Sequence, residues 1–81
     1  MSRRVHVQYY AVLRERAGIA GETVETAAGD AAALYDELSG RRGLAFPRAI
    51  LRVAINDEFA EWTSALADGD RVVFIPPVAG G

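Results

Sequence analysis

The segment that decides the fold is residues 66–81, LADGDRVVFIPPVAGG. Residues 67–70 of this segment, ADGD, are typical of a tight turn. The run that follows alternates as a half-buried strand does, with Val72 and Phe74 on one face and Ile75 on the other, beside the polar Arg71. This final strand is therefore expected to lie in a sheet with one buried face, and Ile75 on its more exposed face.

The strand runs into two prolines and a thin end. Pro76 and Pro77 have no N–H donor and hold φ near −65°, so the chain is expected to leave the sheet stiffly. Fully extended, the remaining four residues reach about 13–14 Å. They are small and end in two glycines: Val78, Ala79, Gly80 and Gly81. We therefore divide the chain into a domain, 1–77, and a flexible tail, 78–81.

A tail of this shape can pass through a narrow channel and present its α-carboxylate inside another protein. A carboxylate is a poor electrophile, but adenylation by ATP converts it into a mixed anhydride. A sulfur or nitrogen nucleophile can then displace AMP, and Gly81 is the least hindered residue for that attack. The alternative is a frayed terminus of small residues without a function.

The rest of the chain predicts an α+β domain. Strands are expected at 3–10, 22–27, 49–57 and, as a short piece, 59–62. A helix of one to two turns is expected at 11–17, and the main helix is expected to begin after the N-cap Asp30 and to end at Gly40. The predicted architecture is a mixed sheet of four to five strands with one main helix packed on one face.

Composition excludes several functional classes. The 81 residues contain no cysteine, which excludes a disulfide, a thiol nucleophile and a thiolate metal site. The net charge of −2 argues against a nucleic-acid partner. No segment approaches the ~20 apolar residues of a membrane span, and the first residues do not form a signal peptide. A cytoplasmic protein without a membrane partner is expected.

Other candidate residues receive structural interpretations. His6 stands alone, without further ligands at metal-like spacing, so no metal site is expected. Arg41 and Arg42 are expected in a solvated loop. Trp62 is interpreted as an anchor in or beside the core, and not as a platform for a ligand.

Three stretches carry a resemblance to a known family: VQYYAVLRERAG near the start, VAIND in the middle and the segment quoted first. With them, the sequence resembles the ubiquitin-like β-grasp sulfur carriers, in particular the small subunits of molybdopterin synthase. The likeness spans nearly the whole chain, although 27–47 contributes little to it. The fold that it implies is the β-grasp.

The resemblance implies a reaction sequence at Gly81. An ATP-dependent adenylyltransferase related to ubiquitin-activating enzymes adenylates it, and a sulfur donor system converts it into a thiocarboxylate. The tail then enters the large subunit of molybdopterin synthase, where it donates sulfur to cyclic pyranopterin monophosphate. The implied assembly is a heterotetramer whose catalytic side chains lie in the large subunit. The carrier itself is not an enzyme and holds no permanent cofactor, since ATP is used by the activating enzyme.

The resemblance also implies a docking surface on the sheet. Its positions match Tyr10, Phe59 and Ile75, with Arg14 as a basic neighbour. The alternative is that a bulge shifts the alternation and places these residues in the core. Three other functions stay open: a carrier for thiamine or cysteine biosynthesis, a ubiquitin-like protein modifier, and a β-grasp binding module with an unused tail. Since the chain has no lysine, a modifier could not form lysine-linked chains but could be attached singly.

Overall fold

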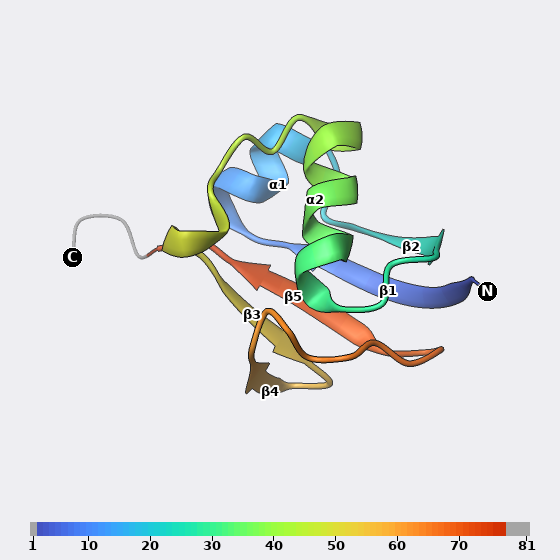
Figure 1. The fold of residues 1–81 in the computed structure, drawn as a ribbon. Coiled ribbons are helices and arrows are strands. Elements are labelled where there is room, and N and C mark those ends of the chain that lie inside the picture. The colour runs from blue at the N-terminus through green and yellow to red at the C-terminus, as the bar shows by residue number, and fades with distance from the viewer. Residues whose placement is uncertain (1, 78–81) are drawn as a thin grey trace.

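A computed structural model describes residues 2–77. It contains a five-stranded sheet, two α-helices and one 3₁₀ helix (Figure 1). In chain order the elements are β1 Arg3–Tyr9, α1 Ala11–Ala17, β2 Gly21–Thr26, α2 Ala31–Arg42, η1 Arg48–Ile50, β3 Arg52–Ile55, β4 Glu58–Ala60 and β5 Arg71–Ile75. The predicted α+β class is confirmed.

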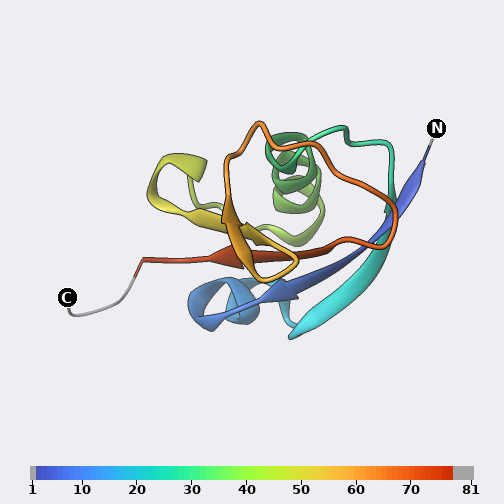
Figure 2. The same ribbon diagram turned by 90° about the horizontal axis from the view of Figure 1, so that it is seen from below.

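The sheet is mixed, with the strand order β2-β1-β5-β3-β4. The central strands β1 and β5 are parallel, and every other pair is antiparallel. As a result, the end of β1, the end of β5 and the start of β3 meet at one end of the sheet. Helix α2 crosses one face, and Figure 2 shows it nearly end-on beside the strands. We call the opposite face, which α2 leaves uncovered, the outer face.

The core lies between the sheet and α2. The predicted inward positions are buried on β1 and β5, where Val5, Val7, Tyr9, Val72 and Phe74 are each at most 3% exposed. The Trp62 ring stacks on Phe74 with centroids 6.0 Å apart and meets Tyr35 edge-on at 5.7 Å. The interpretation of Trp62 as an anchor beside the core is therefore confirmed.

The two ends of α2 differ in how well the sequence predicts them. Asp30 caps the start as expected, because its Oδ1 accepts the N–H of Ala33 at 2.8 Å. The predicted end at Gly40 is wrong, since the helix continues to Arg42 and Gly43 ends it with φ +67°. A glycine inside a helix costs only about 1 kcal/mol, so Gly40 alone does not stop it.

The longer helix also corrects the expectation for Arg41 and Arg42, which lie in its last turn and not in a loop. Arg41 pairs with Glu37 one turn earlier, at 2.9 Å. Arg42 reaches across to Glu22 on β2. Both cations also lie where the negative end of the helix dipole favours positive charge.

Helix α1 forms as predicted and ends at Gly18, which has φ +79°. The β3–β4 hairpin turns on Asn56 and Asp57, both with positive φ, as a two-residue turn of this kind requires. Strand β4 covers 58–60 and is shorter than the predicted 59–62. The chain then bends, and Trp62 enters the core.

Candidate functional site

The last described residues mark where the chain leaves the sheet. Strand β5 ends at Ile75, one residue before the diproline, as predicted. Pro76 is buried, whereas Pro77 is exposed. We call this place, beside α1 and the start of β3, the exit end (Figure 1). The predicted tail 78–81, with the reactive Gly81, lies outside the described residues.

An apolar hollow of about 500 Å³ lies at the exit end, between α1 and the end of β5. Among residues 2–77, Glu15 is the one charged residue that lines it. The others are Tyr10, Ala11, Val12, Ile75, Pro76 and Pro77. The hollow therefore joins two of the predicted docking residues, Tyr10 and Ile75, to the diproline that precedes the tail.

A local turn presents Tyr10 to solvent. Tyr10 is extended, with φ −123° and ψ 151°, and Ala11 then adopts φ +50°. The chain reverses there, so that the carbonyl of Tyr10 accepts the N–H of Leu13 at 3.0 Å. Leu13 enters the core, and Tyr10 stays 46% exposed. Positive φ is unfavourable for alanine, so contacts around the turn hold it in place.

Strand register shows which residues share the outer face. Phe59 lies opposite Ala54, Ala54 opposite Val73, and Val73 opposite Gln8. Residues directly opposite one another point to the same side of a sheet. Ile75 points to that side too, since it is two residues beyond Val73. We call the apolar members of this surface the outer patch: Tyr10, Ala54, Phe59, Val73 and Ile75.

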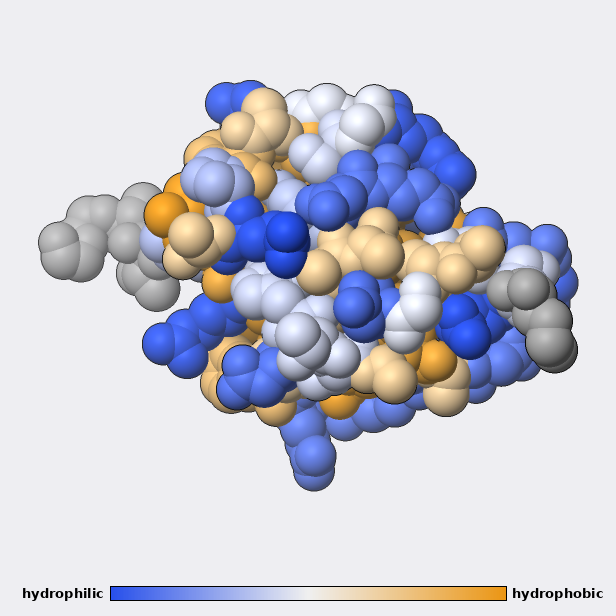
Figure 3. All heavy atoms as spheres, viewed as in Figure 1, coloured by the Kyte–Doolittle hydropathy of each residue, from blue (hydrophilic) through white to orange (hydrophobic). Residues whose placement is uncertain are grey.

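The outer patch decides between the two interpretations of the docking residues. Phe59 is 71% exposed and Ile75 is half-buried, so neither belongs to the core. The bulge alternative is therefore wrong for Phe59 and Ile75, and also for Tyr10, which is 46% exposed. Figure 3 shows the opposite, α2-covered side, where hydrophilic and hydrophobic residues are interspersed.

Arg14 lies near the patch but not in it. It is exposed on α1, and its N–H points to the carbonyl of Tyr10 at 3.4 Å. It lines a second hollow, which shares Ala11 and Glu15 with the apolar one. The structure thus brings Tyr10 and Ile75 together, places Phe59 two strands away, and sets Arg14 beside them on the helix.

Two further residues of this surface were not among the predicted docking residues. Val73 precedes Ile75 by two residues on β5 and lies opposite Gln8 on β1. Arg52 lies opposite Ile75, and its guanidinium carbon is 5.8 Å from the centroid of the Phe59 ring. Alternation along β3 already separates Arg52 from the buried Leu51 and Val53. Only the strand pairing shows that it lies beside Ile75 and Phe59.

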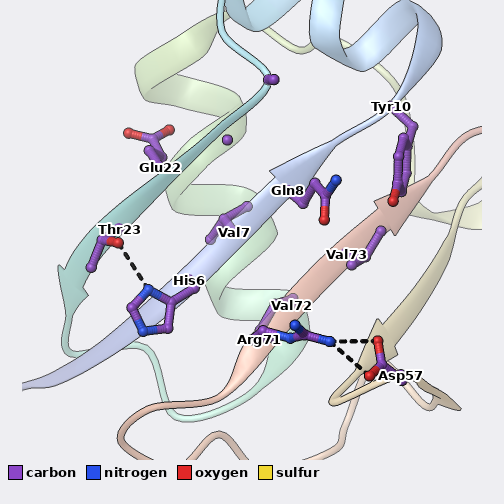
Figure 4. A pocket seen from close by; sticks show the side chains of 12 residues that line it. His6, Val7, Gln8, Tyr10, Glu22, Thr23, Asp57, Arg71, Val72 and Val73 are labelled. Atoms are coloured by element: carbon purple, nitrogen blue, oxygen red, sulfur yellow. Dashed lines mark hydrogen bonds and ion pairs between the residues drawn. The ribbon is translucent and has the colours of Figure 1, made fainter.

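Away from the exit end, the outer face is polar and its groups are paired. A shallow hollow of about 660 Å³ runs along β1 and β5, and Figure 4 shows Gln8, Tyr10 and Val73 on its exit side. At the other side, the imidazole of His6 hydrogen-bonds the hydroxyl of Thr23 at 2.9 Å. Arg71 donates to both carboxylate oxygens of Asp57 at 2.7 Å. His6 is thus an exposed residue that is paired with a hydroxyl group.

A second charged cluster lies beneath β2. The hydroxyl of Tyr9 donates to Glu22 at 2.7 Å, and the Nε of Arg42 donates to the same carboxylate at 3.0 Å. Arg42 and the Tyr9 hydrogen bond lower the pKa of Glu22 below its usual value, although partial burial opposes them. Burial and the neighbouring Glu22 raise the pKa of Tyr9. This cluster joins β1, β2 and the end of α2, and it does not line the apolar hollow.

Residues 2–77 contain neither a cluster of metal ligands nor a helix that could cross a membrane. No three His, Asp or Glu side chains there are grouped to hold a metal ion. None of the helices in this part of the chain combines the length and the apolar character that a membrane crossing requires.

Comparison with known proteins adds a family. The model of the ThiS family matches residues 7–81. A molybdopterin synthase sulfur carrier subunit from Haemophilus influenzae is 32% identical over 80 residues, which cover 95% of this chain and 99% of that protein.

Solved structures agree with the fold. Small archaeal modifier protein 1 from Haloferax volcanii has a TM-score of 0.78 at 28% identity, covering 94% of this chain and 99% of that one. A complex of subunits 1 and 2 of the molybdopterin-converting factor from Helicobacter pylori contains a chain with a TM-score of 0.65 at 28% identity, covering 96% and 99%. A ubiquitin from Caldiarchaeum subterraneum, 17% identical with a TM-score of 0.66 over both full lengths, shares the fold, which confirms the ubiquitin-like β-grasp.

Proposed function

The chain belongs to the ThiS family of small sulfur carriers, and from this premise we propose that it is the sulfur-carrier subunit of a molybdopterin synthase. The observation that carries the proposal is the full-length match to the Haemophilus influenzae carrier subunit. The family match also extends through Gly81, so it includes the residue to which we assign the chemistry.

The proposed reaction takes place at the C-terminal carboxylate. An oxygen of Gly81 attacks the α-phosphorus of ATP on an activating adenylyltransferase, and pyrophosphate leaves. A sulfur nucleophile from a donor system then attacks the acyl carbon and displaces AMP, which gives a thiocarboxylate. The thiocarboxylate sulfur is transferred to cyclic pyranopterin monophosphate during formation of the molybdopterin dithiolene. Each dithiolene takes two sulfurs and so uses two thiocarboxylates, and an oxygen from water or from the substrate returns each Gly81 to a carboxylate that can be charged again.

In this proposal the chain supplies sulfur and the partner supplies catalysis. The large subunit binds the pterin and provides the catalytic side chains, within a heterotetramer of two small and two large subunits. This chain contributes no catalytic side chain and no permanent cofactor. The complex of subunits 1 and 2 from Helicobacter pylori supports a partner of this kind.

The geometry of the exit end supports a docked tail. The outer patch and the apolar hollow adjoin the diproline, so a partner that covers them receives the tail at the same time. Exposed apolar side chains beside a functional segment are typical of an interface. We assign docking to Tyr10, Phe59 and Ile75, with Arg14 at the margin, and projection of the tail to Pro76 and Pro77.

A single-turnover assay tests the pathway. The thiocarboxylated chain is mixed with the cognate large subunit and cyclic pyranopterin monophosphate, and molybdopterin is quantified. The thiocarboxylate form is expected to yield product, and the carboxylate form none. Absence of product would contradict the molybdopterin assignment. Sulfur transfer to a thiamine or cysteine precursor would then identify a related carrier.

A protein modifier is the second candidate, favoured by the 28% identity to the archaeal modifier. It shares adenylation of Gly81, but an amine replaces sulfur as the nucleophile. Intact-mass analysis of cellular proteins that carry covalently attached chain would distinguish the two. A carrier is expected to leave no such adducts, whereas a modifier is expected to leave the chain joined through Gly81 to lysine amines of other proteins.

A further inference from the structure

The arginines of this chain fall into two groups. Five have a carboxylate partner, Arg4, Arg41, Arg42, Arg48 and Arg71, and Arg3 donates to the backbone carbonyl of Ala28 at 2.6 Å. The remaining Arg14, Arg16 and Arg52 have no carboxylate partner within residues 2–77. Arg16 and Arg52 lie instead over the rings of Phe46 and Phe59, at 4.9 and 5.8 Å.

The unpaired group lies toward the exit end. Arg52 is opposite Ile75, the last residue of β5. Arg14 and Arg16 lie on α1, whose residues Ala11 and Glu15 line the hollow with the diproline. Figure 1 shows α1 and the start of β3 near the end of β5.

The opposite end of the sheet is different. Because β1 and β5 are parallel, Arg4 and Arg71 both lie near the start of β5. Each has a carboxylate partner there, Glu25 and Asp57 respectively. The loop before β5 adds Asp68, which accepts the N–H of Arg4 at 2.7 Å, and Asp70. Of the four arginines without a carboxylate partner within residues 2–77, three therefore lie toward the exit end, and Arg3 lies at the opposite end.

Arg52 differs from an ordinary surface arginine in its surroundings. It lies opposite Ile75 and 5.8 Å from the centroid of the Phe59 ring, and Glu61 lines the same hollow without forming an ion pair with it. A cation next to an apolar contact becomes desolvated when a partner covers the patch. An anion that the partner places opposite the guanidinium offsets that loss.

We propose that the surface of the partner that receives the tail carries carboxylates opposite Arg52, with Arg14 and Arg16 extending the positive region that steers the exit end toward it. This inference rests on the proposed function, since it names the charge of the surface on the large subunit. Complementary charge at an interface raises the association rate and fixes orientation more than it adds affinity. The chain is thus expected to approach its partner with the exit end first.

The test measures association of the full chain with the cognate large subunit by stopped-flow fluorescence. Three variants are compared with the unchanged chain. Arg52→Glu reverses the charge in the patch, and Arg52→Lys keeps the charge. Arg4→Glu makes the same change in net charge on the same face, at the opposite end. Circular dichroism checks that each variant is folded.

The proposal predicts about a tenfold slower association for Arg52→Glu at low salt, with Arg4→Glu close to the unchanged chain. Arg52→Lys should retain most of the rate. The difference should shrink as salt shortens the Debye length from about 10 Å at 0.1 M to about 3 Å at 1 M. Equal effects of Arg52→Glu and Arg4→Glu, or an Arg52→Glu rate that matches the unchanged chain, would overturn the proposal.

A further variant separates this inference from the function on which it rests. Phe59→Ala removes apolar contact without changing charge. If Phe59→Ala weakens binding and Arg52→Glu does not, docking through the outer patch stands and the acidic partner surface is overturned. If the unchanged chain does not bind the large subunit at all, both are overturned.

Discussion

Tyr9 and Tyr10 are neighbours in the sequence and belong to two different regions. Tyr9 is 1% exposed, and its hydroxyl is held by Glu22, which Arg42 holds in turn. Tyr10 is 46% exposed and lines the apolar hollow at the exit end. The inner region pairs its charges and buries its rings, whereas the exit end leaves apolar and positive groups uncovered. The comparison assigns stability to the first region and recognition to the second.

The largest effect on stability is expected from Phe74→Ala, measured by urea unfolding. Phe74 is fully buried between the rings of Tyr35 and Trp62. Its truncation should lower the free energy of unfolding by about 3–5 kcal/mol. The matched control is Phe59→Ala on the same sheet, which should cost less than about 1 kcal/mol because Phe59 is exposed. Similar losses of unfolding free energy for both variants would contradict the division into a buried inner region and an exposed exit end.

Phe59 should matter for binding, although its truncation should cost little stability. Phe59→Ala is expected to raise the dissociation constant for the cognate large subunit about tenfold, as removal of an aromatic anchor at an interface does. Isothermal titration calorimetry measures the constant. Leu38→Val, a small change in the core, serves as a control that should leave binding unchanged. Unchanged binding of the Phe59 variant would remove the outer patch from the docking surface.

The Glu22 cluster should make stability depend on acid pH. Since the pKa of Glu22 is lowered in the folded chain, its contribution is complete above the usual value of 4.5 and is lost as the pH falls below it. Glu22→Gln should lower the free energy of unfolding at neutral pH by about 1–3 kcal/mol. It should also make the acid limb, the fall of this free energy below pH 4.5, less steep. The measurement is urea unfolding across a pH series.

Glu25 on the same strand provides the control for that series. Its pair with Arg4 is solvent-exposed, so Glu25→Gln should change stability by less than about 1 kcal/mol. An acid limb that is as steep in Glu22→Gln as in the unchanged chain would show that the cluster does not link pH to folding.

The smallest effects concern the two glycines at the end of α2. Gly40 lies inside the helix with open space around it, so Gly40→Ala should stabilise the fold by about 0.5–1 kcal/mol. Gly43 has φ +67°, so Gly43→Ala should destabilise it by about 1 kcal/mol despite equal space. Thermal unfolding compares them. Effects of the same sign would contradict the helix end described above.

These glycines also show what the sequence could predict and what it could not. Alternation identified the buried faces of β1 and β5, and Asp30 identified the start of α2, because these signals are local. Gly40 looked like a stop, but a glycine ends a helix through its backbone conformation, which composition does not reveal. Alternation also placed Ile75 outside the core correctly, whereas Tyr10 is exposed because β1 ends at Tyr9 and the chain turns there.

The remaining features depend on contacts between distant segments. The register that brings Arg52 beside Phe59 and Ile75 follows from pairing of β3 with both of its neighbours. Arg42 reaches Glu22, 20 positions away in the sequence. No local pattern encodes such pairs. The division at residue 77, the tail and the role of Gly81 stay predictions, since they rest on residues outside the described part of the chain.

In the proposed function, the reactive centre is the end group of Gly81 and no side chain. Intact-mass analysis after incubation with the cognate activating enzyme, ATP and a sulfur donor tests this assignment, with a chain that lacks Gly81 as the control. We expect exchange of one oxygen for sulfur at the C-terminus of the full chain and none in the control. No exchange, under conditions that charge a known carrier, or equal charging of the shortened chain, would contradict it.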